Sequence, residues 1–173
     1  MLALLLILIA AQAQGAPLPE RLANGGFERS LEGWSIAGHH GLRADVAPNV
    51  RWSSDRAPQG RHILNVGWRA RSGAPPGAEM RVTTRISARL HRGRRLRISA
   101  LTRAPDFAHH TSRLIANAGA EASVASIGAS ATWRRHDLVL LVPRDATFIE
   151  IGFVTRGTAG ELDADDVRLE VLR

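Results

Sequence analysis

The side chains most able to do chemistry in this chain are carboxylates near its two ends. Glu28 lies in the stretch NGGFERSLEGW (24–34), and Asp163 and Asp165 open the stretch DADDVRLEVL (163–172). Because alternate residues of a strand share a face, these two aspartates are expected on the apolar side of the last stretch, with Val167, Leu169 and Val171. A carboxylate on a core-facing side is costly unless a cation pairs with it or a metal binds it. These carboxylates are therefore candidates for ion pairs or for metal ligands.

No pattern of residues indicates catalysis. The chain has no G-x-S-x-G, phosphate-binding loop or H-E-x-x-H motif, and it has no cysteine to act as a nucleophile, form a disulfide or bind a metal. Two histidine doublets, His39-His40 and His109-His110, lie in predicted loops, where we expect solvated side chains rather than metal ligands. We therefore expect a protein that is not an enzyme.

The chain is strongly basic. It carries 23 Lys and Arg against 16 Asp and Glu, a net charge of +7, and every basic residue is arginine. Such an excess favours anionic neighbours. Arg81, Arg85, Arg95 and Arg97 are expected together on one exposed sheet face, where arginine can bind carboxylate or phosphate groups in a bidentate way. The alternative is a solvated face that keeps the sheet from aggregating.

Aromatic side chains are scarce, with no Tyr, four Trp and four Phe. Recognition of sugars uses aromatic faces together with a few planar polar groups. Phe27, Trp34 and Trp68 are expected to fill the core, and Trp52 and Phe107 are the candidates for exposure in loops. The predicted ligand-binding residues are therefore Trp52, Phe107, Arg95 and Arg97.

The elements that must position these residues are β-strands. Short runs of alternating apolar and polar residues are separated by Gly, Pro, Asn and Asp, which is typical of an all-β sandwich or barrel. The expected strands cover 62–68, 79–87, 94–103, 135–143, 146–154 and 161–172. The run 135–143 is apolar on both sides and is predicted to be central, whereas 104–133 is predicted to hold one or two weak strands and a mobile loop. We expect about eight to ten strands in two layers.

The first residues predict export. Residues 2–11 are uninterruptedly apolar but too short to span a bilayer, and Ala11-Gln12-Ala13 offers an A-x-A cleavage site. We predict a signal peptide over 1–15 and one domain over 16–173, secreted or periplasmic, with no stable membrane span after cleavage. No Arg or Lys precedes the apolar run, so an uncleaved anchor and a misassigned start codon are the alternatives.

Four stretches, in order, resemble one family. LANGGFERSLEGW (22–34) resembles the opening signature of the cellulase-C-type carbohydrate-binding modules, which are galactose-binding-like jelly rolls, and DADDVRLEVL resembles their closing strand. RGRRLRISALTR (92–103) is similar to their glycine turn and following strand, and TWRRHDLVLLVPRDATFIEIGFV (132–154) to their next strand pair. The resemblance implies a jelly-roll β-sandwich over essentially the whole chain after the leader, without specifying a ligand.

The resemblance also implies a structural calcium ion. In such jelly rolls the first and last strands lie near one another, and the ligands are Glu28 and Asp165 with backbone oxygens from around Gly26 and the turn at 59–62. Carboxylates and carbonyls suit this hard cation. The alternative is that Glu28 and Asp165 pair with arginines.

These observations lead to two expected functions. The first is a secreted, non-catalytic module that binds a polysaccharide or an acidic envelope component. The second is a structural or protein-interaction jelly-roll domain with no sugar site, whose partner is an envelope protein. The chain has no nucleic-acid-binding motif, so we expect no nucleic-acid partner.

Overall fold

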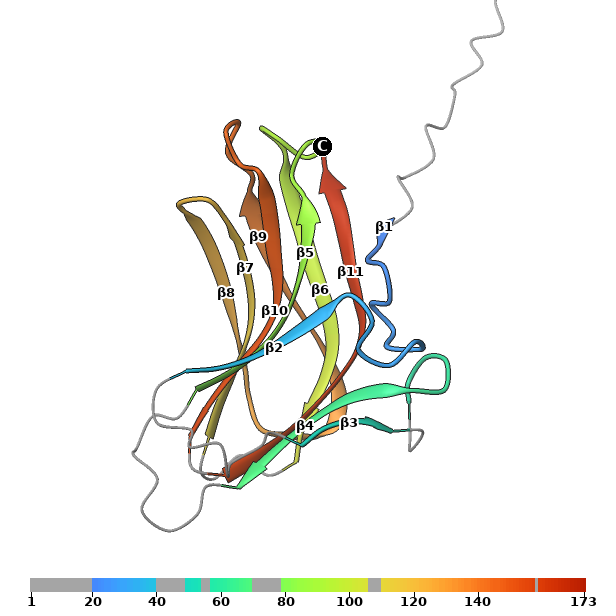
Figure 1. Cartoon of the computed structure of the whole chain (residues 1–173). Coiled ribbons are helices and arrows are strands. Elements are labelled where there is room, and N and C mark those ends of the chain that lie inside the picture. Colours follow the sequence, from blue (N-terminus) through green and yellow to red (C-terminus); the bar gives the residue numbers. More distant parts are fainter. Residues whose placement is uncertain (1–19, 40–48, 54–56, 70–78, 106–109, 158) are drawn as a thin grey trace, which may run out of the picture.

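A computed structural model describes residues 20–39, 49–53, 57–69, 79–105, 110–157 and 159–173 of the chain. The described residues form no helix. Their strands, β1 to β11, form two antiparallel sheets that pack against each other as a β-sandwich (Figure 1). The predicted all-β jelly-roll class is confirmed. Strands are more numerous than the eight to ten we expected.

The six-stranded sheet contains the last strand near its middle. Its order is β3 (Asn49–Ser53), β4 (Ile63–Arg69), β11 (Ala159–Leu172), β6 (Arg95–Ala104) and β9 (Ser130–Leu141), and the short β1 (Glu20–Arg21) also pairs with β11. The five-stranded sheet has the order β2 (Trp34–His39), β5 (Glu79–Ser87), β10 (Phe148–Gly157), β7 (His110–Ala118) and β8 (Glu121–Ile127).

The core lies between the inner faces of the two sheets. β6 buries Leu96 and Ile98 fully, and β10 buries Ile151 and Phe153. Their neighbours along each strand point outward, because side chains alternate between the two faces. Burial of such aliphatic and aromatic side chains is the main stabilising contribution to the fold.

Phe27 and Trp34 belong to this core, as predicted. Phe27 is fully buried, its ring centroid lies 4.9 Å from that of Trp34, and Trp34 stacks on Phe153 at 6.4 Å. The loop that carries them is shaped by Asn24, whose side-chain amide donates to the carbonyl oxygens of Ser30 and Glu32, both at 3.0 Å. Asn24 has φ +57, a conformation that asparagine tolerates better than most residues.

The segment 104–133 is more regular than its sequence predicts. β7 and β8 form a hairpin that closes at Gly119, which has φ +61, and β9 begins at Ser130. Residues 106–109, part of the predicted mobile loop, lie outside the described residues. The prediction of weak strands was wrong because Leu114 and Ala116 of β7 are fully buried in the core. The inner face of β7 is hard to recognise in the sequence because several of its side chains are small.

β9 is an edge strand, so the prediction of a central strand over 135–143 was wrong. Within the described residues β9 pairs with β6 alone. Leu138 and Leu140 face the core, but Val139 and Leu141 lie on the outer face and are 37% and 53% exposed. The apolar residues on both faces of β9 are therefore explained by an apolar outer surface, not by a position between two neighbouring strands.

A β-bulge in β11 reverses the predicted orientation of the aspartates. Asp165 pairs with Leu101 but Arg168 pairs with Ser99, so β11 has one extra residue at this point. Leu162 and Ala164 face the core before the bulge, and Val167 and Leu169 face it afterwards. Asp163 therefore lies on the outer face of the sheet, and the expectation that it shares a face with Val167 was wrong. Asp166, within the bulge, has φ +50.

Candidate functional site

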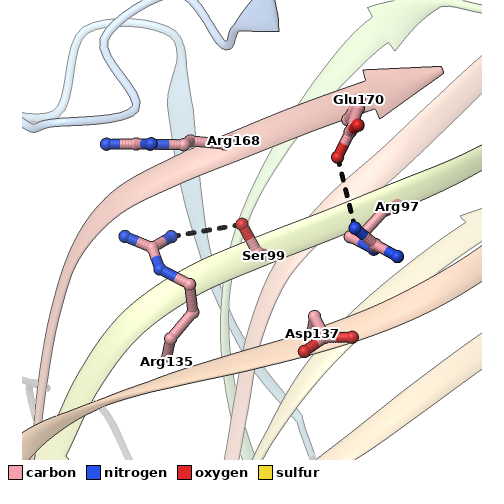
Figure 2. A pocket seen from close by; sticks show the side chains of 6 residues that line it. All are labelled: Arg97, Ser99, Arg135, Asp137, Arg168 and Glu170. Atoms are coloured by element: carbon pink, nitrogen blue, oxygen red, sulfur yellow. Dashed lines mark hydrogen bonds and ion pairs between the residues drawn. The ribbon is translucent and has the colours of Figure 1, made fainter. Parts of the chain in front are cut away.

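A polar pocket of about 350 Å³ lies on the outer face of the six-stranded sheet (Figure 2). Three adjacent strands supply its lining, in pairs of residues: Arg168 and Glu170 from β11, Arg97 and Ser99 from β6, and Arg135 and Asp137 from β9. Figure 2 shows these side chains rising from neighbouring strands around Ser99. The pocket thus depends on strands that are far apart in the sequence.

The register explains why the sheet is hollowed at this point. Arg168, Ser99 and Asp137 form one row across three strands, because Ser99 pairs with Arg168 on one side and with Asp137 on the other. The central residue of the row is the smallest of the three. A short side chain between two longer ones leaves a depression with a polar floor.

The arginine side chains of the pocket are held in place by contacts with other lining residues and by contacts with Asp166 behind the lining. Arg135 donates from Nη1 to Ser99 Oγ at 3.2 Å, and Arg97 Nη1 lies 3.5 Å from Glu170 Oε2 (Figure 2). Behind the lining, the buried carboxylate of Asp166 receives Arg135 Nη2 at 2.5 Å and Arg168 Nε at 2.8 Å. Asp166 therefore holds two of the three arginines through charge-assisted hydrogen bonds.

The predicted ligand-binding residues have different outcomes. Arg97 lines the pocket, and Arg95, two residues earlier in β6, lies on the same outer face but is not among its lining residues. The backbone of Trp52 lies in β3, not in a loop, opposite Leu64. The side chain of Trp52 and all of Phe107 lie outside the described residues.

The expected grouping of four arginines on one face was wrong. Arg81 and Arg85 lie in β5 of the five-stranded sheet, and Arg95 and Arg97 lie in β6 of the other sheet. Arg81 contacts Glu79 at 2.7 Å and Arg85 contacts Glu150 at 2.9 Å. The two pairs of arginines are on outward faces of different layers, so they cannot bind one ligand together.

Five lining residues were missed by the sequence analysis: Ser99, Arg135, Asp137, Arg168 and Glu170. Each is an outward-facing polar residue of a correctly expected strand. Their proximity follows from the order and register of β11, β6 and β9, which a local pattern does not reveal. Among the described residues that line the pocket, none is aromatic.

A second site, which we call the clasp, joins the opening loop to β11 and consists of Glu28, Gln59, Gly60 and Asp165. Glu28 Oε1 accepts hydrogen bonds from the backbone N–H groups of Arg61 at 2.7 Å and His62 at 3.1 Å. Asp165 Oδ2 accepts one from the backbone of Gln59 at 3.1 Å. The structure therefore brings both predicted carboxylates to the same short turn. Glu28, but not Asp165, lines an adjacent cavity of about 170 Å³.

Electrostatics differ sharply between the two carboxylates of the clasp. Burial raises the pKa of Asp165 to about 6, and the negative charges of Asp166 and Glu28 add to this, although backbone hydrogen bonds oppose it. The backbone N–H of Arg61 holds the pKa of Glu28 below its ordinary value. Asp165 is fully buried, so its ionised form is the costly one.

Arginine pairing, the alternative to metal binding, occurs at Asp163 rather than at Asp165. Asp163 contacts Arg103 Nε and also accepts from Asn65 Nδ2, each at 2.5 Å. In the described part of the chain, neither Glu28 nor Asp165 forms an ion pair with an arginine; Glu28 contacts His62 Nδ1 at 3.1 Å. The three aspartates of β11 thus have different surroundings.

Histidines do not form a metal site in the part of the structure that is described. No group of three or more His, Cys, Asp and Glu side chains is arranged there to hold a metal ion. His110 is buried in β7, so the prediction that it is a solvated loop residue was wrong, and His109 lies outside the described residues. The described residues include no helix long and apolar enough to cross a membrane.

Solved structures with the same fold are mostly carbohydrate-binding modules. TmCBM61, a structure in complex with β-1,4-galactotriose, has a TM-score of 0.62 and 16% identity over 88% of this chain and 99% of its own. The family 11 module of the cellulosomal cellulase Lic26A-Cel5E of Clostridium thermocellum has a TM-score of 0.59 and 13% identity over 89% of this chain and 95% of its own.

The same fold also occurs as part of an enzyme chain. The enzymatically active domain of tailspike protein 4 of bacteriophage CBA120 has a TM-score of 0.65 and 17% identity over 88% of this chain, which corresponds to 21% of the tailspike chain. No protein-family model matches the chain, and no curated protein sequence matches it. The chain thus has the jelly-roll fold of carbohydrate-binding modules.

Proposed function

We propose that this protein is a non-catalytic carbohydrate-binding module that holds a polysaccharide in the polar pocket of the six-stranded sheet. The observation that carries the proposal is the lining of that pocket. Arg97 and Arg135 donate hydrogen bonds, Asp137 and Glu170 accept them, and Ser99 does both. Sugar hydroxyls also donate and accept, so a mixed set of planar polar groups is suited to them.

Binding rather than hydrolysis is supported by the position of the carboxylates. Glycoside hydrolysis uses a carboxylic acid whose surroundings keep it protonated. Asp137 and Glu170 instead lie on an open sheet face, and Glu170 contacts Arg97. Because Asp166 already offsets part of the charge of Arg135 and Arg168, we expect neutral polysaccharides to bind as well as acidic ones.

The leader supports an extracellular or periplasmic site of action. We propose that residues 1–15 are a signal peptide and that 16–173 form the module. The ligand is then a polysaccharide or another component outside the cytoplasm. Residues 1–15 lie outside the described part of the structure.

Binding isotherms with soluble polysaccharides test the proposal. A galactan and a xylan serve as neutral ligands and a polyuronate as an acidic one. We expect Arg97→Ala and Asp137→Ala each to weaken binding by about tenfold to about a hundredfold, since a lost hydrogen bond to a charged group contributes on the order of 1.5–3 kcal/mol. Arg113→Ala, on the outer face of β7 in the other sheet, is the matched control and should bind like the wild type.

Two results would contradict this assignment. One is wild-type protein that binds none of the polysaccharides. The other is weakening by Arg113→Ala with no effect of Arg97→Ala, which would move the ligand to the other sheet.

The second candidate function, a structural or protein-interaction domain, is favoured by one observation. Among the described residues that line the pocket there is no aromatic side chain for stacking on a sugar ring. Co-purification of one envelope protein, together with indifference to every polysaccharide, would support this function instead.

We also propose that the clasp binds a structural calcium ion. Glu28 and Asp165 would supply its side-chain oxygens, and backbone carbonyls of the same turns would complete the set. The fit is supported by the fully buried Asp165, whose carboxylate accepts hydrogen bonds from the backbone N–H groups of Gln59 and Asp166. When bound, calcium would supply the positive charge that offsets these buried carboxylates.

Thermal unfolding with and without calcium tests the clasp. Calcium at about one hundred times its dissociation constant should stabilise the chelator-treated protein by about 2.7 kcal/mol, which raises Tm by about 5–10 °C. Asp165→Ala should remove this rise, and Asp137→Ala, which lies in the pocket, should keep it. If calcium leaves the Tm of the chelated wild type unchanged, the clasp does not bind it.

A further inference from the structure

One end of the sandwich is built from two turns that are joined to each other. The turn 88–94 links β5 to β6, and the turn 142–147 links β9 to β10 (Figure 1). The backbone N–H of Gly93 donates to Val142 O at 2.8 Å, and that of Val142 donates to Arg94 O at 2.9 Å. We call the exposed residues Arg89, Leu90, Arg92, Arg94 and Arg144 of these turns the arginine tip.

The arginine tip concentrates positive charge. Its four arginines are accompanied by a single acidic residue in the two turns, Asp145. Within the described residues none of the four forms an ion pair, although Arg92 Nε donates to Ala146 O at 2.8 Å. Arginines on the sheet faces differ, since many of them contact a carboxylate, as Arg81, Arg85, Arg97, Arg103, Arg135, Arg156 and Arg168 do.

Large apolar side chains are exposed at the same end. Leu90 is 75% exposed, more than any other large apolar residue of the described chain. Leu141 and Phe148, on either side of the second turn, are 53% and 41% exposed. Exposed apolar residues surrounded by polar ones commonly mark an interaction surface.

The arginine tip is held in a fixed shape. Between Leu90 and Arg92, the side chain of His91 is buried, and its backbone N–H donates to Ala88 O at 2.9 Å. The backbone N–H of Arg94 donates to His91 O at 3.0 Å, so the turn is closed by its own hydrogen bonds. Leu90 and its flanking arginines are therefore presented outward together.

We propose that the arginine tip docks onto an anionic lipid bilayer. The arginines would contact phosphate groups of the lipids, which guanidinium binds in a bidentate way, and Leu90 would enter the apolar boundary below them. Basic residues near an anionic membrane surface each add to its attraction. A soluble polyanion would use the arginines but would gain nothing from Leu90.

This surface is separate from the polysaccharide pocket. The pocket lies on the outer face of β11, β6 and β9, and the arginine tip lies at the end of the sandwich where β6 begins and β9 ends (Figure 1). A protein docked by its tip would leave its sheet faces open to solvent. The inference therefore does not depend on the proposed function.

Vesicle co-sedimentation of the full chain tests the proposal. We compare vesicles of phosphatidylcholine alone with vesicles that also contain phosphatidylglycerol, and measure the increment in binding caused by the anionic lipid. We expect phosphatidylglycerol to increase the affinity for vesicles clearly. This increase should become at least tenfold smaller when salt rises from about 0.1 M to about 0.5 M, because salt screens exposed charges. All variants carry the same residues 1–15, so a difference between variants does not arise from that segment.

Variants separate the two components of the surface. Arg94→Gln with Arg144→Gln should reduce the increment about tenfold, and Leu90→Ser should reduce it severalfold without changing the charge. The matched control, Arg113→Gln with Arg134→Gln, removes the same charge from exposed positions outside the two turns and should keep the increment.

Three results would overturn the proposal. The first is the lack of any increment with phosphatidylglycerol. The second is equal loss in the control double variant, which would mean that only net charge matters. The third is full binding by Leu90→Ser, which would show that the arginines act by charge alone and that Leu90 does not enter the bilayer.

Discussion

Adjacent aspartates at the bulge of β11 show how strongly the surroundings of a residue decide its chemistry. Asp166 is buried but receives two arginines, so its charge is compensated. Asp165, its neighbour, is equally buried and receives backbone N–H groups instead. A pair of identical side chains therefore supports two different sites, one at the pocket and one at the clasp.

The raised pKa of Asp165 predicts how stability depends on pH when calcium is absent. Its pKa rises from an ordinary 3.8 to about 6, so the native state holds the proton at pH values where the unfolded chain has lost it. The contribution of Asp165 to the free energy of unfolding should therefore fall as pH rises from about 4 to about 6, by roughly 3 kcal/mol, and stay lower above that range.

Asp165→Asn provides the comparison, because an amide keeps the shape but does not titrate. In chelator, urea unfolding of this variant should lack the fall between about pH 4 and pH 6 and should show a more stable protein than the wild type at neutral pH. A difference in stability between the wild type and Asp165→Asn that stays constant through this range would contradict the assignment.

At the scale of the element, period-two alternation predicted most strands well. The expected strand 79–87 coincides with β5, and 62–68 differs from β4 by one residue at each end. Alternation gave wrong predictions at two places, one in β11 and one in β7. The bulge in β11 changed the face of Asp163, and the small side chains of β7 concealed its buried side.

Local pattern could not predict the pocket, although each of its strands was expected. Arg97 was singled out from β6, but its neighbours come from β9 and β11, whose pairing with β6 depends on the whole sheet. Glu28 and Asp165 were paired correctly because the resemblance supplied the proximity of the two ends. The alternation of the last strand alone predicted the wrong face for Asp163 and Asp165.

The contact between the opening loop and β11 predicts a sharp cost at Gly25. A Cβ added there would lie 2.3 Å from the backbone oxygen of Val167, and the same two residues share a hydrogen bond from Val167 N to Gly25 O at 2.9 Å. Gly25→Ala must therefore push the loop from the strand. We expect a loss of about 2–3 kcal/mol in the free energy of unfolding, as for other overpacked sites.

Gly128→Ala is the control for this prediction. A Cβ at Gly128 would meet no atom within 4 Å, so the change should be neutral or stabilising by up to about 1 kcal/mol. Denaturant unfolding of both variants measures the difference. Equal stability of the two would show that the loop yields without cost.

At the scale of the whole molecule, charge is distributed unevenly over the surface. Sheet-face arginines commonly contact carboxylates, whereas the arginines of the tip form no ion pair within the described chain. The net charge of +7 predicted an anionic neighbour but not its position. Basic and apolar residues lie together at one end of the sandwich because the turns 88–94 and 142–147, distant in the sequence, are hydrogen-bonded to each other.

The central position of β11 has a consequence for the order in which the chain acquires its structure. β4 and β6 belong to the same sheet, yet β11 lies between them. During synthesis, β11 is the last of the described strands to be made, so β4 and β6 remain without their shared neighbour until then. Such long-range pairing is slow and leaves strand edges open for association with other chains. The edges of β4 and β6 that β11 covers in the finished sheet therefore stay open until β11 is made.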